Sequence, residues 1–176
     1  PAGAGYAGHA ADARPAMPGP VAEVAGADRL ASGPGPGADF LRAVLRDVGG
    51  FAVKIESTGI AHTWDAWQTV LSSDNPFDQY RGVVVLIGDE HYFYSCGMHH
   101  FNLPDCQASR QLPVAEAADT MNRFNYYQIV ERPTLAPGHT FSLTPDSPSY
   151  RLTLISDARH GEDDFFMNPK GLWNME

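Results

Sequence analysis

Residues 95–106 contain two cysteines and two adjacent histidines, the residue types that bind soft metals. They are Cys96, His99, His100 and Cys106. Thiolate and imidazole are the usual protein ligands of zinc and copper. Cys96 and His99 are spaced so that one turn can present two ligands to one ion, and Cys106 completes the set if the loop folds back. The four residues therefore define a candidate zinc or copper site, or the centre of a thiol-dependent enzyme.

The pattern has competing structural interpretations. Neighbouring residues in an extended chain point in opposite directions, so His99 and His100 rarely serve one ion together. Cys96 can instead pack as a small buried hydrophobe while one histidine hydrogen-bonds the loop. A disulfide between Cys96 and Cys106 is a third interpretation, and it requires an oxidising compartment. We therefore expect no cofactor, with zinc or copper as the alternative.

Other catalytic patterns are weak. Cys106 with His139 is a second conceivable thiol–imidazole pair. The chain has no Gly-x-Ser-x-Gly elbow, no phosphate-cradling glycine loop and no His-Glu-x-x-His helix. A non-enzymatic protein is therefore favoured, although an enzyme stays open.

A second polar segment, residues 157–164, is mostly acidic. It can bind a cation or a basic protein surface, or simply be a solvated loop. We predict that this loop and the loop at 97–105 contact a partner. The residues predicted to make that contact are Met98, His99, His100, Asp105, Asp157, Glu162, Asp163 and Asp164.

The charge balance indicates which partners to expect. The chain carries a formal charge of −9, from 21 acidic and 12 basic residues that form no basic cluster. Nucleic-acid binding needs clustered Lys and Arg, so we expect no nucleic-acid partner and favour a basic protein. No apolar run approaches the roughly 18 residues of a membrane span, and no signal-peptide pattern opens the chain. We expect no membrane association and a bacterial cytoplasmic location. Membership of a longer polypeptide or a larger assembly is an open alternative.

The elements that must position these residues begin after an arm. Residues 1–38 are dominated by Ala, Gly and Pro, which favours a flexible arm or linker, and residues 39–176 are expected to form one domain. Apolar spacing predicts a helix at 40–48 ended by Gly49, a helix capped by Thr63 and closed by a turn at 74–76, and a helix from Pro113. The predicted strands are 51–56, a buried central strand at 83–87 with its hairpin partner at 91–96, then 140–143 and 150–155. The apolar tail at 165–173 is expected to dock as a closing strand or turn. The fold class is therefore α+β, with a mixed, largely antiparallel sheet and about three helices packed on it.

One stretch resembles a known family. Residues 94–105 read Tyr-Ser-Cys-Gly-Met-His-His-Phe-Asn-Leu-Pro-Asp, similar to the Gly-Met…Phe-Gly-Leu-Pro-Glu/Asp signature of an uncharacterised bacterial domain family. Residues 133–140, Pro-Thr-Leu-Ala-Pro-Gly-His-Thr, resemble a later segment of that family. Asn102 stands where the family more often has Gly, and His139 where it more often has Asp. The resemblance implies an accessory or immunity-type protein that binds rather than turns over, and it transfers no catalytic residues.

The leading hypothesis is therefore a non-enzymatic bacterial protein-binding module that neutralises or escorts a partner such as a toxin domain. The first alternative is a metal- or thiol-dependent enzyme centred on residues 96–106. The second is a structural subunit tethered into an assembly by its N-terminal arm.

Overall fold

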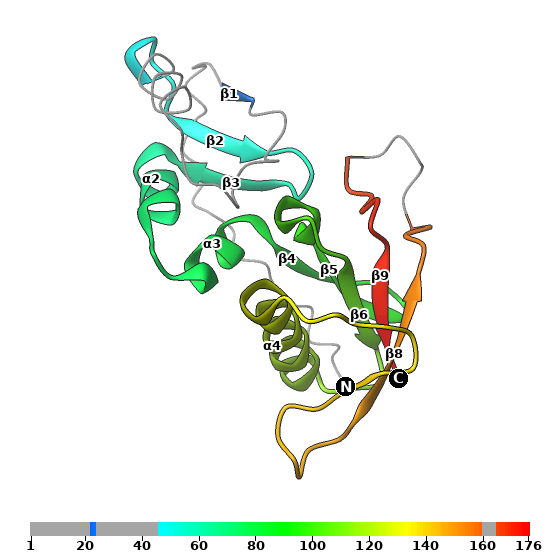
Figure 1. Ribbon diagram of the computed structural model, residues 1–176. Coiled ribbons are helices and arrows are strands. Elements are labelled where there is room, and N and C mark those ends of the chain that lie inside the picture. The colour runs from blue at the N-terminus through cyan, green and yellow to red at the C-terminus, as the bar shows by residue number, and fades with distance from the viewer. Residues whose placement is uncertain (1–21, 24–45, 160–164) are drawn as a thin grey trace, which may run out of the picture.

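A computed structural model describes residues 22–23, 46–159 and 165–176 (Figure 1). Within them, three helices accompany a six-stranded sheet of order β4-β5-β6-β9-β8-β7 and a smaller sheet of order β1-β2-β3. All neighbours in the larger sheet are antiparallel except β6 and β9, which run parallel. The predicted class, an α+β fold with a mixed and largely antiparallel sheet, is confirmed. The predicted arm, apart from β1 (Ala22–Glu23), and most of the helix predicted at 40–48 lie outside the described residues.

The smaller sheet leads into two helices. β2 (Ala52–Ile55) pairs with β1 in parallel and with β3 (Ile60–Thr63) in antiparallel register. The predicted cap is confirmed, because Thr63 Oγ1 accepts from Ala66 N at the start of α2 (Trp64–Ser72). The predicted turn at 74–76 instead begins a helix that the sequence analysis missed. Asn75 accepts from Phe77 N and caps α3 (Pro76–Val83), with Pro76 in the first turn.

The strand predicted at 83–87 is corrected by the structure. Val83 ends α3, and the strand itself is β4 (Val85–Gly88), which forms an edge of the six-stranded sheet rather than its centre. The run of β-branched residues at 83–85 suggested one buried strand. Val83 and Val84 are buried instead in the apolar cluster around α2 and α3, whereas β4 is only half-buried. The hairpin from β4 to β5 (Tyr92–Cys96) is confirmed.

The sequence did not fully predict two strands inside the larger sheet. β6 (Asp105–Ser109) was not predicted as a strand: the loop expected at 97–105 ends at its first residue, yet four of its five residues are buried. β9 (Leu172–Met175), from the tail expected to dock, lies between β6 and β8 (Tyr150–Ile155). β7 (Thr140–Phe141) pairs with β8 at the other edge of the sheet.

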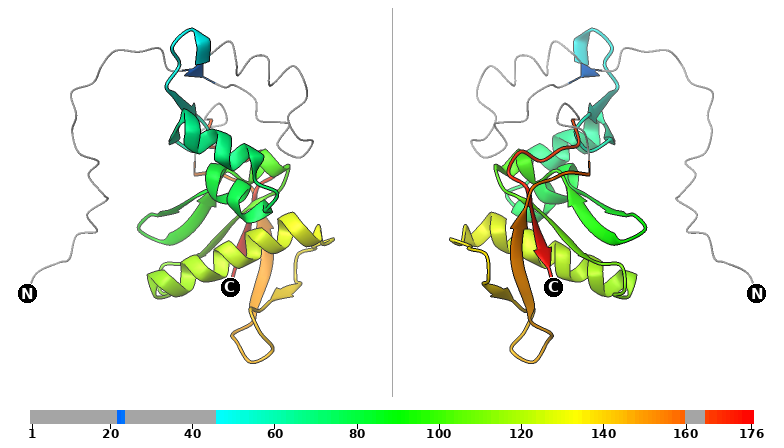
Figure 2. Two further views of the ribbon diagram at one scale, coloured as in Figure 1. Left: turned by 90° about the vertical axis from the view of Figure 1, so that its left-hand side faces the viewer. Right: turned by 90° about the vertical axis from the view of Figure 1, so that its right-hand side faces the viewer.

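One long helix covers a single face of the larger sheet. α4 (Val114–Glu131) follows Pro113, as predicted, and lies in front of β8 and β9 in the left view of Figure 2 and behind them in the right view. It packs Met121 and Phe124 against the sheet and places Ile129 in a second apolar cluster formed with α2, α3 and the smaller sheet. The described residues include no helix that is both long and apolar enough to cross a membrane.

Candidate functional site

Asp105 organises the loop that the sequence analysis singled out. It is fully buried at the start of β6. Its Oδ1 accepts from Ser95 Oγ at 2.9 Å and from Met98 N at 3.2 Å, and its Oδ2 accepts from Asn168 Nδ2 at 2.6 Å. Burial raises the pKa of this carboxyl to about 6, against the opposing effect of the three hydrogen bonds. Asp105 therefore joins the loop to the tail as an internal acceptor.

Asn168 connects this carboxylate to a second one. Its backbone N donates to Asp157 Oδ2 at 3.0 Å, and Asp157 also binds the guanidinium of Arg159 at 2.9 and 3.1 Å. Burial raises the pKa of Asp157, but its hydrogen bonds and the ion pair with Arg159 outweigh this effect and lower the pKa below its ordinary value. The guanidinium carbon lies 3.8 Å from the ring centroid of Tyr94, a cation–π contact on β5. Asp157 thus joins Arg159 to Asn168, and Arg159 packs on β5.

His100 lies in a short 3-10 helix, η2 (Met98–Phe101), against the β2–β3 turn. Its Nε2 lies 2.8 Å from Ser57 Oγ, and its ring centroid is 4.3 Å from that of His99. Burial, and secondarily the neighbouring His99, lower the pKa of His100 to about 4, so the ring is neutral near pH 7. This contact holds the loop to the smaller sheet.

The four predicted metal ligands do not converge. Cys96 Sγ faces the β2–β3 turn, 3.3 Å from Ser57 O, whereas Cys106 Sγ lies on the α4 side of the sheet, 4.0 Å from Met121 O. Among the described residues, no three His, Cys, Asp or Glu side chains are grouped to hold a metal ion. The two cysteines are not joined by a disulfide. In this structure Cys96, His99, His100 and Cys106 therefore do not form one cluster, because the two thiols contact different parts of the fold.

The placement of the cysteines predicts low thiol reactivity. Cys96 and Cys106 are 1% and 0% exposed, and burial raises the pKa of the Cys106 thiol. We expect an aromatic disulfide reagent to titrate neither thiol in the native protein and both after urea unfolding. Fast native labelling of one thiol would show that its strand end opens on the timescale of the assay.

Burial also limits the predicted partner contacts. Met98, His100, Asp105 and Asp157 are buried, and His99 is half-buried, so a partner cannot reach most of this set in the described conformation. Glu162, Asp163 and Asp164 lie outside the described residues. Of the described residues in the predicted set, only His99 is therefore partly accessible.

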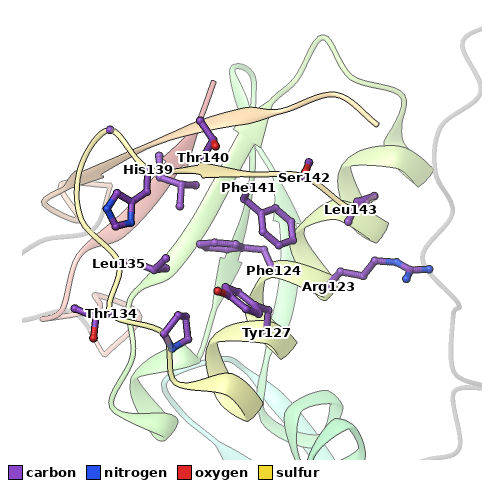
Figure 3. Close-up of a pocket in the computed structure, with 13 residues that line it drawn as sticks. Arg123, Phe124, Tyr127, Thr134, Leu135, His139, Thr140, Phe141, Ser142 and Leu143 are labelled. Carbon is purple, nitrogen blue, oxygen red and sulfur yellow. The ribbon is translucent and has the colours of Figure 1, made fainter. Parts of the chain in front are cut away.

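The described residues contain an open groove between α4 and β7, with a volume of about 840 Å³. Figure 3 looks into it, with β7 above, α4 below and the loop at 133–139 closing one end. Aromatic rings line its interior: the Phe141 centroid lies 5.0 Å from that of Phe124, edge to face, and 5.9 Å from that of Tyr127. The remaining lining residues are Arg123, Pro133, Thr134, Leu135, Gly138, His139, Thr140, Ser142, Leu143 and Leu152.

A glycine turn builds the wall of this groove. His139 N donates to Ala136 O at 3.1 Å, with Pro137 and Gly138 (φ +93°) between them, the features of a type II turn. Gly138 N donates to Leu152 O at 2.8 Å, while Leu152 N donates to His139 O at 2.8 Å. Two residues thus oppose one, which is a glycine bulge that redirects the chain into β7.

The arginine that lines the groove is paired with a carboxylate on the same helix. Arg123 extends along α4, where its Nε bonds both carboxylate oxygens of Asp119 at 2.9 and 3.0 Å. From the sequence, His139 was considered as a thiol partner and as part of the stretch at 133–140 that resembles the bacterial family, but not as the wall of a groove. The Pro-Gly dipeptide was the available signal for the turn, but no local pattern predicted the cavity beside it.

No protein-family model, curated protein or solved structure matches this chain.

Proposed function

We propose that this chain is a non-enzymatic protein-binding module and that the groove between α4 and β7 receives the partner. The supporting observation is the groove itself, an open aromatic-lined cavity beside an edge strand. Small-molecule sites enclose most of their ligand, whereas this groove lies open along the edge of the sheet. Surface cavities with aromatic walls are typical of the anchoring points of protein interfaces.

We further propose that the partner is a basic bacterial protein. A formal charge of −9 steers basic proteins toward the chain at long range, and the arginine that lines the groove is itself paired with Asp119. The resemblance of residues 94–105 to the bacterial family supports a partner in a bacterial cytoplasm, such as a toxin domain that is neutralised or a protein that is escorted. Residues 94–105 then act as a scaffold, because they are fastened inside the fold rather than offered to the partner.

The groove is tested by filling it. Leu143 is half-buried and lines the cavity, so Leu143→Trp places an indole in the space that a partner would occupy. Peptides selected from a random display library on the native protein are expected to bind Leu143→Trp at least roughly tenfold more weakly, as loss of one anchor predicts. The affinity is measured by calorimetry, and the variant's fold is checked by its urea transition.

Leu154→Trp is the matched control. Leu154 lies on β8, is 43% exposed and does not line the groove, so the same substitution there should leave peptide affinity unchanged. A photo-reactive amino acid at position 143 should crosslink to one partner protein in the native host, seen as a single product of defined mass. The selected peptide should reduce the yield of that product. If both tryptophan variants bind every selected peptide like the native protein, the groove is not the binding surface.

A further inference from the structure

We propose that the partner segment binds in extended conformation and adds as a strand to the outer edge of β7. This inference rests on the proposed binding function of the groove and specifies how it recognises its partner. Two observations support it: the directions in which the backbone N–H and C=O groups of β7 and β8 point, and the position of the groove beside the outer edge of β7.

The direction of the β7 backbone follows from its neighbours. Arg151 N donates to Glu176 O, and Glu176 N donates to Arg151 O at 3.0 Å, so both backbone groups of Arg151 point toward β9. Thr140 is the antiparallel partner of Arg151 in β8. In an antiparallel ladder, bonded and non-bonded pairs alternate, so the N–H and C=O of Thr140 point away from β8.

The bulge sets this alternation. Both backbone groups of Leu152 point toward the β7 side, where its O accepts from Gly138 N and its N donates to His139 O. Phe141 then opposes Tyr150, and Thr140 lies between these two inward-facing positions. Thr140 is exposed, and within the described part of the chain no hydrogen bond occupies its outward N–H or C=O. The backbone of an extended peptide can accept from the N–H and donate to the C=O of one residue at a sheet edge, so it can satisfy both groups of Thr140.

The cavity provides the side-chain part of the recognition. Phe141 projects from β7 toward α4, where it contacts Phe124 and Tyr127 (Figure 3). Successive side chains of a strand point to opposite faces, so every second side chain of an added strand would enter the same space. Because the rings are apolar and Arg123 is already paired with Asp119, we expect apolar side chains at those alternate positions.

The test uses one peptide selected on the native protein whose binding is weakened by Leu143→Trp. Single N-methylation is scanned along its backbone, because it removes one donor and blocks one strand pairing. We expect a two-residue period, with affinity falling about tenfold or more at alternate positions and less than about threefold at those between. In amide hydrogen exchange, Thr140 N–H should exchange fast in the unliganded protein and become protected in the complex, whereas Phe141 N–H is protected in both.

The outcomes separate the two proposals. Binding that is sensitive to Leu143→Trp but shows no two-residue period and no protection of Thr140 overturns strand addition and leaves the groove as the binding surface. Absence of any such peptide overturns both proposals. If the peptide instead displaces a self-associated form of the protein detected by sedimentation, the occupant of the edge is a second copy of the chain, and the proposal of a separate partner segment is overturned.

Discussion

Gly97→Ala is expected to lower the free energy of unfolding by about 4 kcal/mol, combining backbone strain with overpacking. Gly97 precedes η2 with φ +122° and ψ −3°, a conformation that side-chain-bearing residues rarely adopt. A Cβ there would lie 2.5 Å from Val83 O and 2.8 Å from Thr58 Cγ2. The first contact is with backbone at the end of α3, so the loop itself must shift. Urea unfolding followed by tryptophan fluorescence measures the loss.

Gly49→Ala is the matched control for backbone strain. Gly49 also has a positive φ, +92°, but nothing lies within 4 Å of a Cβ built there. Its replacement should cost only the conformational penalty, about 1 kcal/mol. Equal losses for the two variants would mean that the close packing of Gly97 against Val83 and Thr58 contributes nothing to stability.

Local chemistry predicted the elements that are stabilised within their own segment. Thr63 caps α2 through its own side chain, Pro113 precedes α4, and Gly49 has the predicted left-handed conformation. Each depends on a few neighbouring residues, so its residue types were sufficient evidence.

β6 could not be found in this way, and β9 was expected only as part of a tail that docks as a strand or turn, because some of their polar residues are satisfied by each other and by distant segments. Gln107 Nε2 on β6 donates to Asn174 Oδ1 on β9 at 2.8 Å, and Asp105 depends on Asn168. Alone, such residues indicate a loop, because burying them without partners is costly. Asp105 also accepts from the nearer Ser95 and Met98, but the Gln107–Asn174 and Asp105–Asn168 pairs each span more than sixty residues, so no local window contains either pair.

The same reasoning explains the sites. Met98, Asp105 and Asp157 were predicted to contact a partner because they lie in polar segments, and in the structure all three are buried. The groove depends on which strand ends the sheet, and that is decided by the insertion of β9 between β6 and β8. Apolar spacing predicts the helix that begins at Pro113, but such spacing cannot distinguish a helix face that fills a core from one that lines a cavity.

The second large effect is a pair of opposite pH dependences at the two ends of one loop. The pKa of Asp105 rises from 3.8 to about 6 on folding, so the folded state holds a proton that the unfolded chain releases. Stability from this group is present below pH 3.8 and is lost as pH rises toward about 6. The shift corresponds to about 3 kcal/mol.

His100 acts in the other direction. Its pKa falls from 6.5 to about 4 on folding, so the unfolded chain binds the proton more tightly. Stability is therefore full above pH 6.5 and is lost as pH falls toward about 4, again by about 3 kcal/mol. Asp157, whose pKa is lowered, acts below its ordinary value of 3.8 and so outside this window. The two groups nearly cancel between pH 4 and 6.5, and we expect the native protein's stability to change little from them.

Single substitutions should remove the cancellation. Asp105→Asn keeps an oxygen for Ser95 and Met98 but abolishes the titration, so its stability should fall as pH is lowered from 6.5 to 4, through His100 alone. His100→Gln keeps a polar group near Ser57, and its stability should rise over the same interval, through Asp105 alone. Each slope approaches, at most, about 1.4 kcal/mol per pH unit, and urea unfolding at four pH values measures it. The comparison depends on slopes rather than on absolute stability, so a uniform loss from either substitution does not affect it. Parallel slopes in the two variants would mean that Asp105 and His100 do not titrate as buried groups, and that the loop is open to water rather than fastened between the two sheets.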